Sequence, residues 1–221
     1  FLLSDLKKQH GGTAGNIAYN LSLLKTKVGI FAAAGNDFDE YESFLKKRGI
    51  DISNIKISKD KKTASAFIMT DKADNQITGF YPGAMADSAN YSLKDIKQKP
   101  DFVVISPNDP KTIIKLSREC RELALPFMVD IGMQLPALTP DEIKKIIQKA
   151  TILIGNDYEM ELLFTKTKLA QKDIFEEVRI IITTFGPKGS KIQTANDTII
   201  IQPAKPKEVI DPTGAGDAYR A

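Results

Sequence analysis

The sequence predicts an α/β protein in which helices cover a parallel sheet. From Asp101 onward, short apolar runs alternate with stretches of helical periodicity, and the connections between them are short. Polar residues stand where the predicted strands end, namely Asn108, Asp130, Asn156 and Thr184. Because ligands of such a sheet bind beyond the carboxyl ends of its strands, we expect the functional site at this edge.

The elements of this part of the chain follow one another in order. The predicted strands cover residues 102–105, 127–130, 152–154 and 179–183. The helices between them cover residues 112–123, 140–149 and a stretch that ends near 164. A hairpin over residues 191–202, with its turn at Asn196 and Asp197, follows the last strand.

The first part of the chain predicts a helix, a strand and a second helix. The first helix follows a glycine-rich turn at 11–16, because apolar residues then recur at helical spacing. A strand-like run covers residues 28–34. The second helix contains Tyr41 and ends with basic residues before Gly49, as helix C-termini prefer.

A β-hairpin is predicted between these helices and the parallel sheet. The β-rich runs 63–70 and 76–81 flank a polar turn at 71–75. One face of this hairpin offers little apolar material. We therefore expect the hairpin to cover a site and to contribute little to the main core.

Composition narrows the class of partner. Of the 221 residues, 42% are hydrophobic and 27% are charged, and the net charge of +3 is scattered along the chain. This mildly basic balance suits anionic metabolites and is too diffuse for nucleic acid. The apolar runs are shorter than the ~20 residues of a membrane span. A lone cysteine, Cys120, fits a reducing compartment, so we expect a cytoplasmic protein without membrane partners.

Both ends of the sequence look abrupt. The chain opens on Phe1 without an initiator methionine, and it stops at Ala221, one turn into a predicted helix. We therefore expect it to be part of a longer protein.

The turn at residues 211–217 carries the most specific chemistry. Gly214 and Gly216 allow backbone N–H groups to converge on an anion at the start of a helix. Asp217 would lie beside this anion cradle, where a base can take a proton from a hydroxyl that attacks a phosphate. The pattern predicts a small-molecule kinase, and the chain contains no Gly-x-x-x-x-Gly-Lys-Ser/Thr loop that would indicate a P-loop enzyme.

Two polar motifs each allow two interpretations. Gly11 and Gly12 are either a tight turn or a backbone that approaches a hydroxylated substrate, with Asn16 bonding the hydroxyls. Asn156 and Glu159 are either a helix cap with its capping-box partner or a pair that holds waters around Mg²⁺.

Two further features are equally open. The segment 184–189 is either a plain strand-to-hairpin turn or a loop that meets a nucleotide phosphate. His10, the only histidine, is interpreted as a loop residue and not as a catalyst. With one histidine and one cysteine, the sequence offers no His/Cys metal cluster.

Together these motifs resemble the ribokinase-like (PfkB) family of sugar and nucleoside kinases. Residues 211–217 are similar to the second family signature, and 11–16 with 35–38 are similar to the first. Residues 156–159 match the family's Asn-x-x-Glu motif, and 184–189 match its nucleotide loop. The resemblance spans nearly the whole chain. It implies one three-layer α/β/α domain over 1–221, with a small β lid contributed mainly by about 63–84.

The resemblance also implies roles for individual residues. Asp217 would be the catalytic base, and an anion hole would be formed by the amides of Gly214, Ala215 and Gly216. The substrate-binding residues would be Gly11, Gly12 and Asn16. The nucleotide-binding residues would be Asn156, Thr184, Gly186, Gly189 and Thr213. The implied cofactors are ATP and Mg²⁺, with Glu159 and Asn156 holding the metal through water.

Within the family, the motifs resemble those of the bacterial and archaeal adenosine and nucleoside kinases. This implies phosphorylation of the 5′-hydroxyl of a nucleoside, with adenosine as the first candidate. The alternatives are a sugar kinase of the ribose or fructose type and a catalytically incomplete nucleotide- or sugar-binding fragment. A homodimer formed through the lid follows from the resemblance as well.

Overall fold

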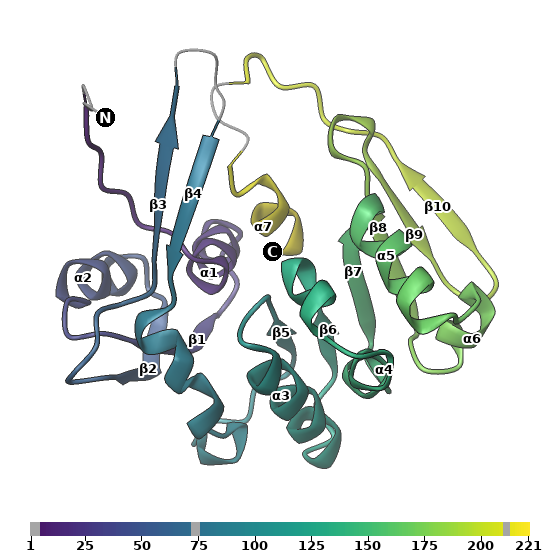
Figure 1. The fold of residues 1–221 in the computed structure, drawn as a ribbon, viewed down its shortest axis with the longest axis horizontal. Helices are drawn as coiled ribbons and strands as arrows, with labels where there is room; N and C mark the ends of the chain where they lie inside the picture. Colours follow the sequence, from purple (N-terminus) through teal and green to yellow (C-terminus); the bar gives the residue numbers. More distant parts are fainter. Residues whose placement is uncertain (1–4, 72–75, 210–212) are drawn as a thin grey trace. The chain divides into compact units, whose positions relative to one another are not determined.

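The chain forms two compact units (Figure 1). The computed structural model describes residues 5–71, 76–209 and 213–221. One unit contains the described residues before position 89 together with 213–221, and the other is Ala89–Val209. The predicted single domain over 1–221 stays a prediction.

The second unit is built on a six-stranded sheet with the order β10-β9-β8-β7-β6-β5. Its strands are β5 (Val103–Ile105), β6 (Phe127–Val129), β7 (Ile152–Asn156), β8 (Ile180–Thr184), β9 (Ser190–Gln193) and β10 (Thr198–Ile201). Strands β5 to β8 pair in parallel, whereas β9 and β10 continue the sheet antiparallel. The parallel strands read as nearly continuous apolar runs, as expected for strands in the middle of a covered sheet.

Helices of this unit pack beside one another against the sheet. They are α3 (Pro110–Glu122), α4 (Pro140–Ile147), α5 (Asp157–Thr167) and the short α6 (Gln171–Phe175). Apolar side chains of these helices are fully buried, namely Ile113, Ile143, Ile146, Leu163 and Ile174. The starts of α3 and α4 are specified locally, because Asp109 and Thr139 cap them and proline occupies the first helical position of each.

The first unit contains a small parallel sheet of two strands. Its elements are α1 (Thr13–Leu23), β1 (Gly29–Ala34), α2 (Asp39–Lys47), β2 (Asp51–Ile57) and α7 (Ala215–Arg220). The core consists of Ala18, Ile30, Ala34, Phe38, Leu45 and Ile50. Helix α7, from the end of the chain, packs beside α1 (Figure 1).

The predicted hairpin is formed by β3 (Ser65–Thr70) and β4 (Gln76–Tyr81), which pair antiparallel. Its side chains are exposed almost throughout, including the large apolar ones of Phe67, Ile77 and Phe80. The expectation that the hairpin adds little to the core is confirmed. The expectation that one face carries little apolar material is wrong, because one face carries Phe67 and Ile77 and the other carries Ile68 and Phe80. Within its predicted turn, residues 72–75 lie outside the described part of the chain.

A turn of the first unit fixes the root of this hairpin. The Oδ1 atom of Asp37 accepts hydrogen bonds from both the amide and the hydroxyl of Thr63, each at 2.8 Å. Burial opposes ionisation of Asp37, but the bonds from Thr63 outweigh it, so the pKa of Asp37 lies below its usual value. A Cβ at Gly35 would overlap the backbone of Lys62 and Thr63, which explains the glycine there.

Several elements differ from those that the sequence predicts. Strand β2 has no counterpart in the prediction, because its polar residues Asp51, Ser53 and Asn54 have low strand propensity. Helix α6 is also unpredicted, as are the 3₁₀ segments η1 (Gly83–Asn90), η2 (Leu93–Asp95) and η3 (Gly132–Ala137). The predicted turn after β8 contains a further 3₁₀ segment, η4 (Gly186–Lys188). Within the described residues, no helix is both long and apolar enough to cross a membrane.

Candidate active site

The turn before α7 and the first helix are joined by one hydrogen bond. The Nδ2 atom of Asn16, in the first turn of α1, donates to Oδ2 of Asp217 in α7 at 2.8 Å. Gly214 precedes α7 with φ of 79°, a conformation that favours glycine, and a Cβ there would lie 3.6 Å from Nδ2 of Asn16. The structure therefore brings together Asn16, Gly214 and Asp217. Residues 211 and 212, the first two of the predicted 211–217 turn, lie outside the described part of the chain.

A second side chain holds the other oxygen of the same carboxylate. The Nη1 atom of Arg220 lies 3.2 Å from Oδ1 of Asp217, one helical turn further along α7. The two side chains are only 15% and 16% exposed. Asp217 therefore accepts a neutral donor on one oxygen and a cationic donor on the other.

The glycine turn before α1 borders open space. Gly12 adopts φ of 86°, and a Cβ at either Gly11 or Gly12 would have no neighbour within 4 Å. The carbonyl of Gly12 accepts the first helical bond, from the amide of Asn16 at 2.9 Å. Both interpretations of this turn remain compatible with the geometry, because the turn starts a helix and also leaves its backbone accessible.

Tyr41 of α2 supports this turn from the side of the core. Its hydroxyl donates to the carbonyl of Gly11 at 2.9 Å, and burial raises the pKa of that phenol. A Cβ at Gly15 would overlap the Tyr41 hydroxyl, so the absence of a side chain at Gly15 leaves the space that the Tyr41 ring occupies. His10 is an exposed loop residue, as expected, and its ring stacks on Tyr41 with centroids 4.5 Å apart.

Strands β7 and β8 align the predicted nucleotide residues of the second unit. Asn156, the last residue of β7, stands opposite Thr184, the last residue of β8. This pairing puts an amide and a hydroxyl side by side at the carboxyl edge of the sheet, where the sequence predicts the functional site.

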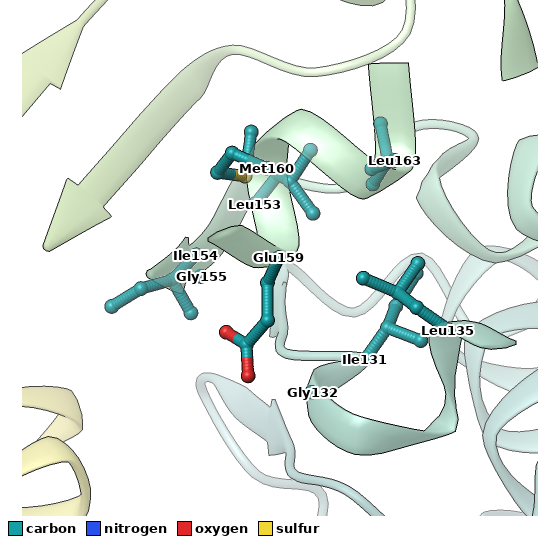
Figure 2. Close-up of a pocket in the computed structure, with 9 residues that line it drawn as sticks. All are labelled: Ile131, Gly132, Leu135, Leu153, Ile154, Gly155, Glu159, Met160 and Leu163. Carbon is teal, nitrogen blue, oxygen red and sulfur yellow. The ribbon is translucent and has the colours of Figure 1, made fainter. Parts of the chain in front are cut away.

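Asn156 and Glu159 form a complete capping box at the start of α5. Oδ1 of Asn156 accepts from the amide of Glu159, and Oε2 of Glu159 accepts from the amide of Asn156, each at 2.8 Å. The capping interpretation is therefore confirmed, and the magnesium role stays a prediction. Figure 2 shows the Glu159 carboxylate at a small cavity of about 10 Å³, directed away from the apolar side chains of Met160 and Leu163.

The loop after β8 divides into a structural glycine and an accessible one. Gly189 has φ of 91°, and a Cβ there would overlap the carbonyl of Ile201, so the hairpin requires this glycine. Gly186 has φ of 55° and open space where a Cβ would project. A turn explains both positive φ values, while only Gly186 leaves room for close approach of a ligand.

These motifs agree with the proteins that the chain resembles. The model of the PfkB family of carbohydrate kinases matches residues 2–221. The chain belongs to the PfkB family.

Curated relatives in this family include archaeal nucleoside kinases. The chain is 34% identical to the nucleoside kinase of Methanocaldococcus jannaschii over 222 residues, and 32% identical to that of Methanothermobacter thermautotrophicus over 228 residues. Each match covers 99% of this chain and 72% of the relative.

Solved structures of nucleoside kinases superpose closely on the chain. The nucleoside kinase of Burkholderia thailandensis in complex with inosine is 32% identical, with a TM-score of 0.94 over 100% of this chain and 74% of that one. The M. jannaschii nucleoside kinase, described as an archaeal member of the ribokinase family, gives a TM-score of 0.92 over 99% of this chain and 73% of that one. These similarities confirm the predicted ribokinase-like α/β fold class.

The PfkB motif residues fall into two groups, one in each unit. The first unit holds the predicted catalytic and substrate residues Gly11, Gly12, Asn16, Gly214, Ala215, Gly216 and Asp217, together with Thr213. The second unit holds Asn156, Glu159, Thr184, Gly186 and Gly189.

The sequence interpretation missed two side chains that touch the first group, Tyr41 and Arg220. The contact of Arg220 could have been predicted, because Arg220 lies three residues after Asp217 at a predicted helix start, and residues at this spacing share a helix face.

Proposed function

We propose that this PfkB-family protein transfers the γ-phosphoryl group of ATP to the 5′-hydroxyl of a nucleoside. The observation that carries this proposal is the hydrogen bond between Asn16 and Asp217. It joins the residue expected to bind substrate hydroxyls to the residue expected to act as base. The archaeal relatives named nucleoside kinases, at 32% and 34% identity, support the substrate class.

Asp217 would accept the proton of the attacking hydroxyl. The O–H bond of the acceptor breaks, its oxygen bonds to the γ-phosphorus, and the bond from that phosphorus to the ADP oxygen breaks. The proton goes to the Asp217 carboxylate, and ADP leaves. Phosphoryl transfer depends mainly on positioning and charge stabilisation, so one base and a set of donors suffice.

The backbone amides around Gly214, Ala215 and Gly216 would bind the phosphoryl group as it transfers. Glycine at 214 allows the αL conformation that starts α7 immediately after the turn. Amides at a helix start favour negative charge, which develops on the transferring group. Gly11 and Gly12 would bind the nucleoside hydroxyls, consistent with the open space at both positions.

The second unit would bind ATP. Thr184, Asn156 and Gly186 present a hydroxyl, an amide and an accessible backbone near the sheet edge, and Gly189 holds the loop in shape. Thr213 would contact the nucleotide from the turn before α7. The B. thailandensis structure described as an ADP-inosine complex, with a TM-score of 0.91 and 32% identity, supports nucleotide use.

The oxygen donors of Asn156 and Glu159 fit a hydrated Mg²⁺. The capping box engages Oε2 of Glu159, and the carboxylate carries a second oxygen. Among the described residues, no group of three or more His, Cys, Asp or Glu residues could hold a metal. Mg²⁺ in phosphoryl-transfer sites usually keeps several waters and is bound partly by substrate phosphates. When bound, Mg²⁺ neutralises charge on the phosphates.

Adenosine is the acceptor proposed first, and inosine is a second purine candidate because a relative of 32% identity has been solved with it. The test is ADP release with adenosine, inosine, cytidine, ribose and fructose 6-phosphate as acceptors. We expect the highest kcat/KM with a purine nucleoside. Higher kcat/KM with ribose or fructose 6-phosphate would favour the sugar-kinase alternative. Calorimetric binding of adenosine or ATP without ADP release would favour a non-catalytic binding fragment.

The lid is the proposed surface for a homodimer. Strands β3 and β4 expose apolar side chains on both faces, including Phe67 and Ile77 on one and Ile68 and Phe80 on the other. Burial between two copies would remove this surface from water. We also propose a cytoplasmic location, because the one cysteine of the sequence, Cys120, is a free thiol, as is usual in a reducing compartment.

A further inference from the structure

Arg220 is the cationic side chain in direct contact with the proposed base. Its Nη1 atom lies 3.2 Å from Oδ1 of Asp217, and both side chains are largely shielded from water. Exposed ion pairs contribute little to the free energy of folding, because water screens the charges and the side chains lose conformational entropy. A pair that is about 15% exposed escapes much of this screening.

The two donors on Asp217 divide its oxygens between them. Asn16 donates to Oδ2, and Arg220 donates to Oδ1. Each carboxylate oxygen has two acceptor sites, so a bond from Asn16 leaves Oδ2 able to accept a proton. Because Asn16 belongs to the expected substrate site, the proposed function would place the acceptor hydroxyl on the Oδ2 side of the carboxylate.

The contact between Arg220 and Asp217 also bears on the choice of glycine at position 216. A Cβ there would lie 2.9 Å from Nη1 of Arg220, closer than ordinary packing allows. With a side chain at position 216, the Arg220 guanidinium would therefore have to move from its place beside Asp217.

We propose that Arg220 is a positioning residue that fixes Oδ1 of Asp217, so that Oδ2 accepts the proton of the attacking hydroxyl. The proposal rests on the proposed kinase function. Arg220 takes no proton itself, since a guanidinium stays charged at all working pH values.

The test compares steady-state kinetics of four variants of the intact protein: Arg220→Gln, Arg220→Lys, Asp217→Asn and the double variant Arg220→Gln with Asp217→Asn. Arg220→Gln should lower kcat about 10- to 100-fold, the effect of losing a hydrogen bond to a charged group. The nucleoside KM should change less than about twofold, because the contact is to the base and not to the substrate. Arg220→Lys should recover part of the loss, because it restores the charge without the planar fork.

The double variant separates positioning from a structural effect. If Arg220 acts through Asp217, adding Arg220→Gln to Asp217→Asn lowers kcat no further.

The matched control is Arg118→Gln, which removes a guanidinium 3.5 Å from Glu122 on the exposed surface of α3 and should leave kcat unchanged. If the Gln variant unfolds, as judged by its melting temperature, Arg220→Met keeps the aliphatic stem and takes its place.

Failure of this inference and failure of the proposed function give different results. Absence of ADP release by the unaltered protein with every acceptor overturns the proposed function. The role of Arg220 is overturned if the unaltered protein is active and Arg220→Gln leaves its kcat unchanged. It is also overturned if Arg220→Gln lowers kcat by the same factor with and without Asp217→Asn. In both cases the proposed function still stands.

Discussion

Asn16 donates from Nδ2 to Oδ2 of Asp217 over 2.8 Å, although 201 positions separate the two residues in the sequence. The bond makes the start of α1 and the start of α7 one polar cluster. If Asn16 both orients the base and binds substrate hydroxyls, its removal should affect binding and turnover together.

We therefore expect Asn16→Ala to lower kcat and to raise the nucleoside KM. Each effect should be about 10-fold, the usual range for loss of a hydrogen bond to a charged or substrate group. Steady-state kinetics measure both. Asn196→Ala, in the exposed turn between β9 and β10, is the matched control and should behave like the unaltered protein. Unchanged kinetics in Asn16→Ala would contradict a shared role for this residue.

The contact between Tyr41 and Gly15 predicts a suppressor pair. Gly15→Ala should destabilise the protein by about 1–3 kcal/mol, because the new methyl group overlaps the Tyr41 hydroxyl. Tyr41→Phe removes that hydroxyl and should cost about 1 kcal/mol through the lost bond to Gly11. In the double variant the two losses should be less than additive, as measured by denaturant unfolding. Strict additivity would show that the hydroxyl does not fill the space above Gly15.

Glu159 can be tested for a role beyond its capping box. Glu159→Gln keeps an acceptor for the Asn156 amide and removes the charge. We expect a small loss of stability and a several-fold rise in the Mg²⁺ concentration needed for half-maximal activity. Glu142→Gln is a matched control, because Glu142 forms the equivalent capping box with Thr139 in α4. If both variants show the same Mg²⁺ dependence, Glu159 acts as a cap alone.

Cys120 predicts a pH dependence of stability. Burial raises the pKa of this thiol to about 12, whereas a solvent-exposed thiol in the unfolded chain releases its proton near pH 9.0. Between these values the folded state binds more protons, so the free energy of unfolding should fall as pH rises, by at most about 1.4 kcal/mol per pH unit. The difference in unfolding free energy between the unaltered protein and Cys120→Ala isolates this contribution from lysine and tyrosine titration. A difference that stays constant from pH 9 to pH 11 would contradict it.

Local sequence signals predicted most of the regular elements. The parallel strands β5 to β8 have continuous apolar runs, and α3, α4 and α5 combine helical periodicity with strong caps, so their positions follow from nearby residues. Strand β2 was missed because its polar residues give little strand signal, and pairing with β1 decides its conformation. Helix α6 is too short for periodicity to show.

Much of the candidate site could be predicted because glycines and carboxylates mark it along the chain. The partners of those residues could not. Tyr41 reaches Gly11 across thirty positions, and no local pattern encodes that contact. The bond of Asn16 to Asp217 likewise depends on packing of α7 beside α1. Sequence proximity could have indicated Arg220, whose spacing from Asp217 is one helical turn.

The central claim is that Asp217 acts as the base for phosphoryl transfer. The most direct measurement compares Asp217→Asn with the unaltered protein, by ADP release and by calorimetric binding of the nucleoside. We predict that kcat falls by about 10²- to 10⁴-fold, the usual contribution of a general base, while the nucleoside Kd changes little. Turnover within about tenfold of the unaltered protein would contradict the account.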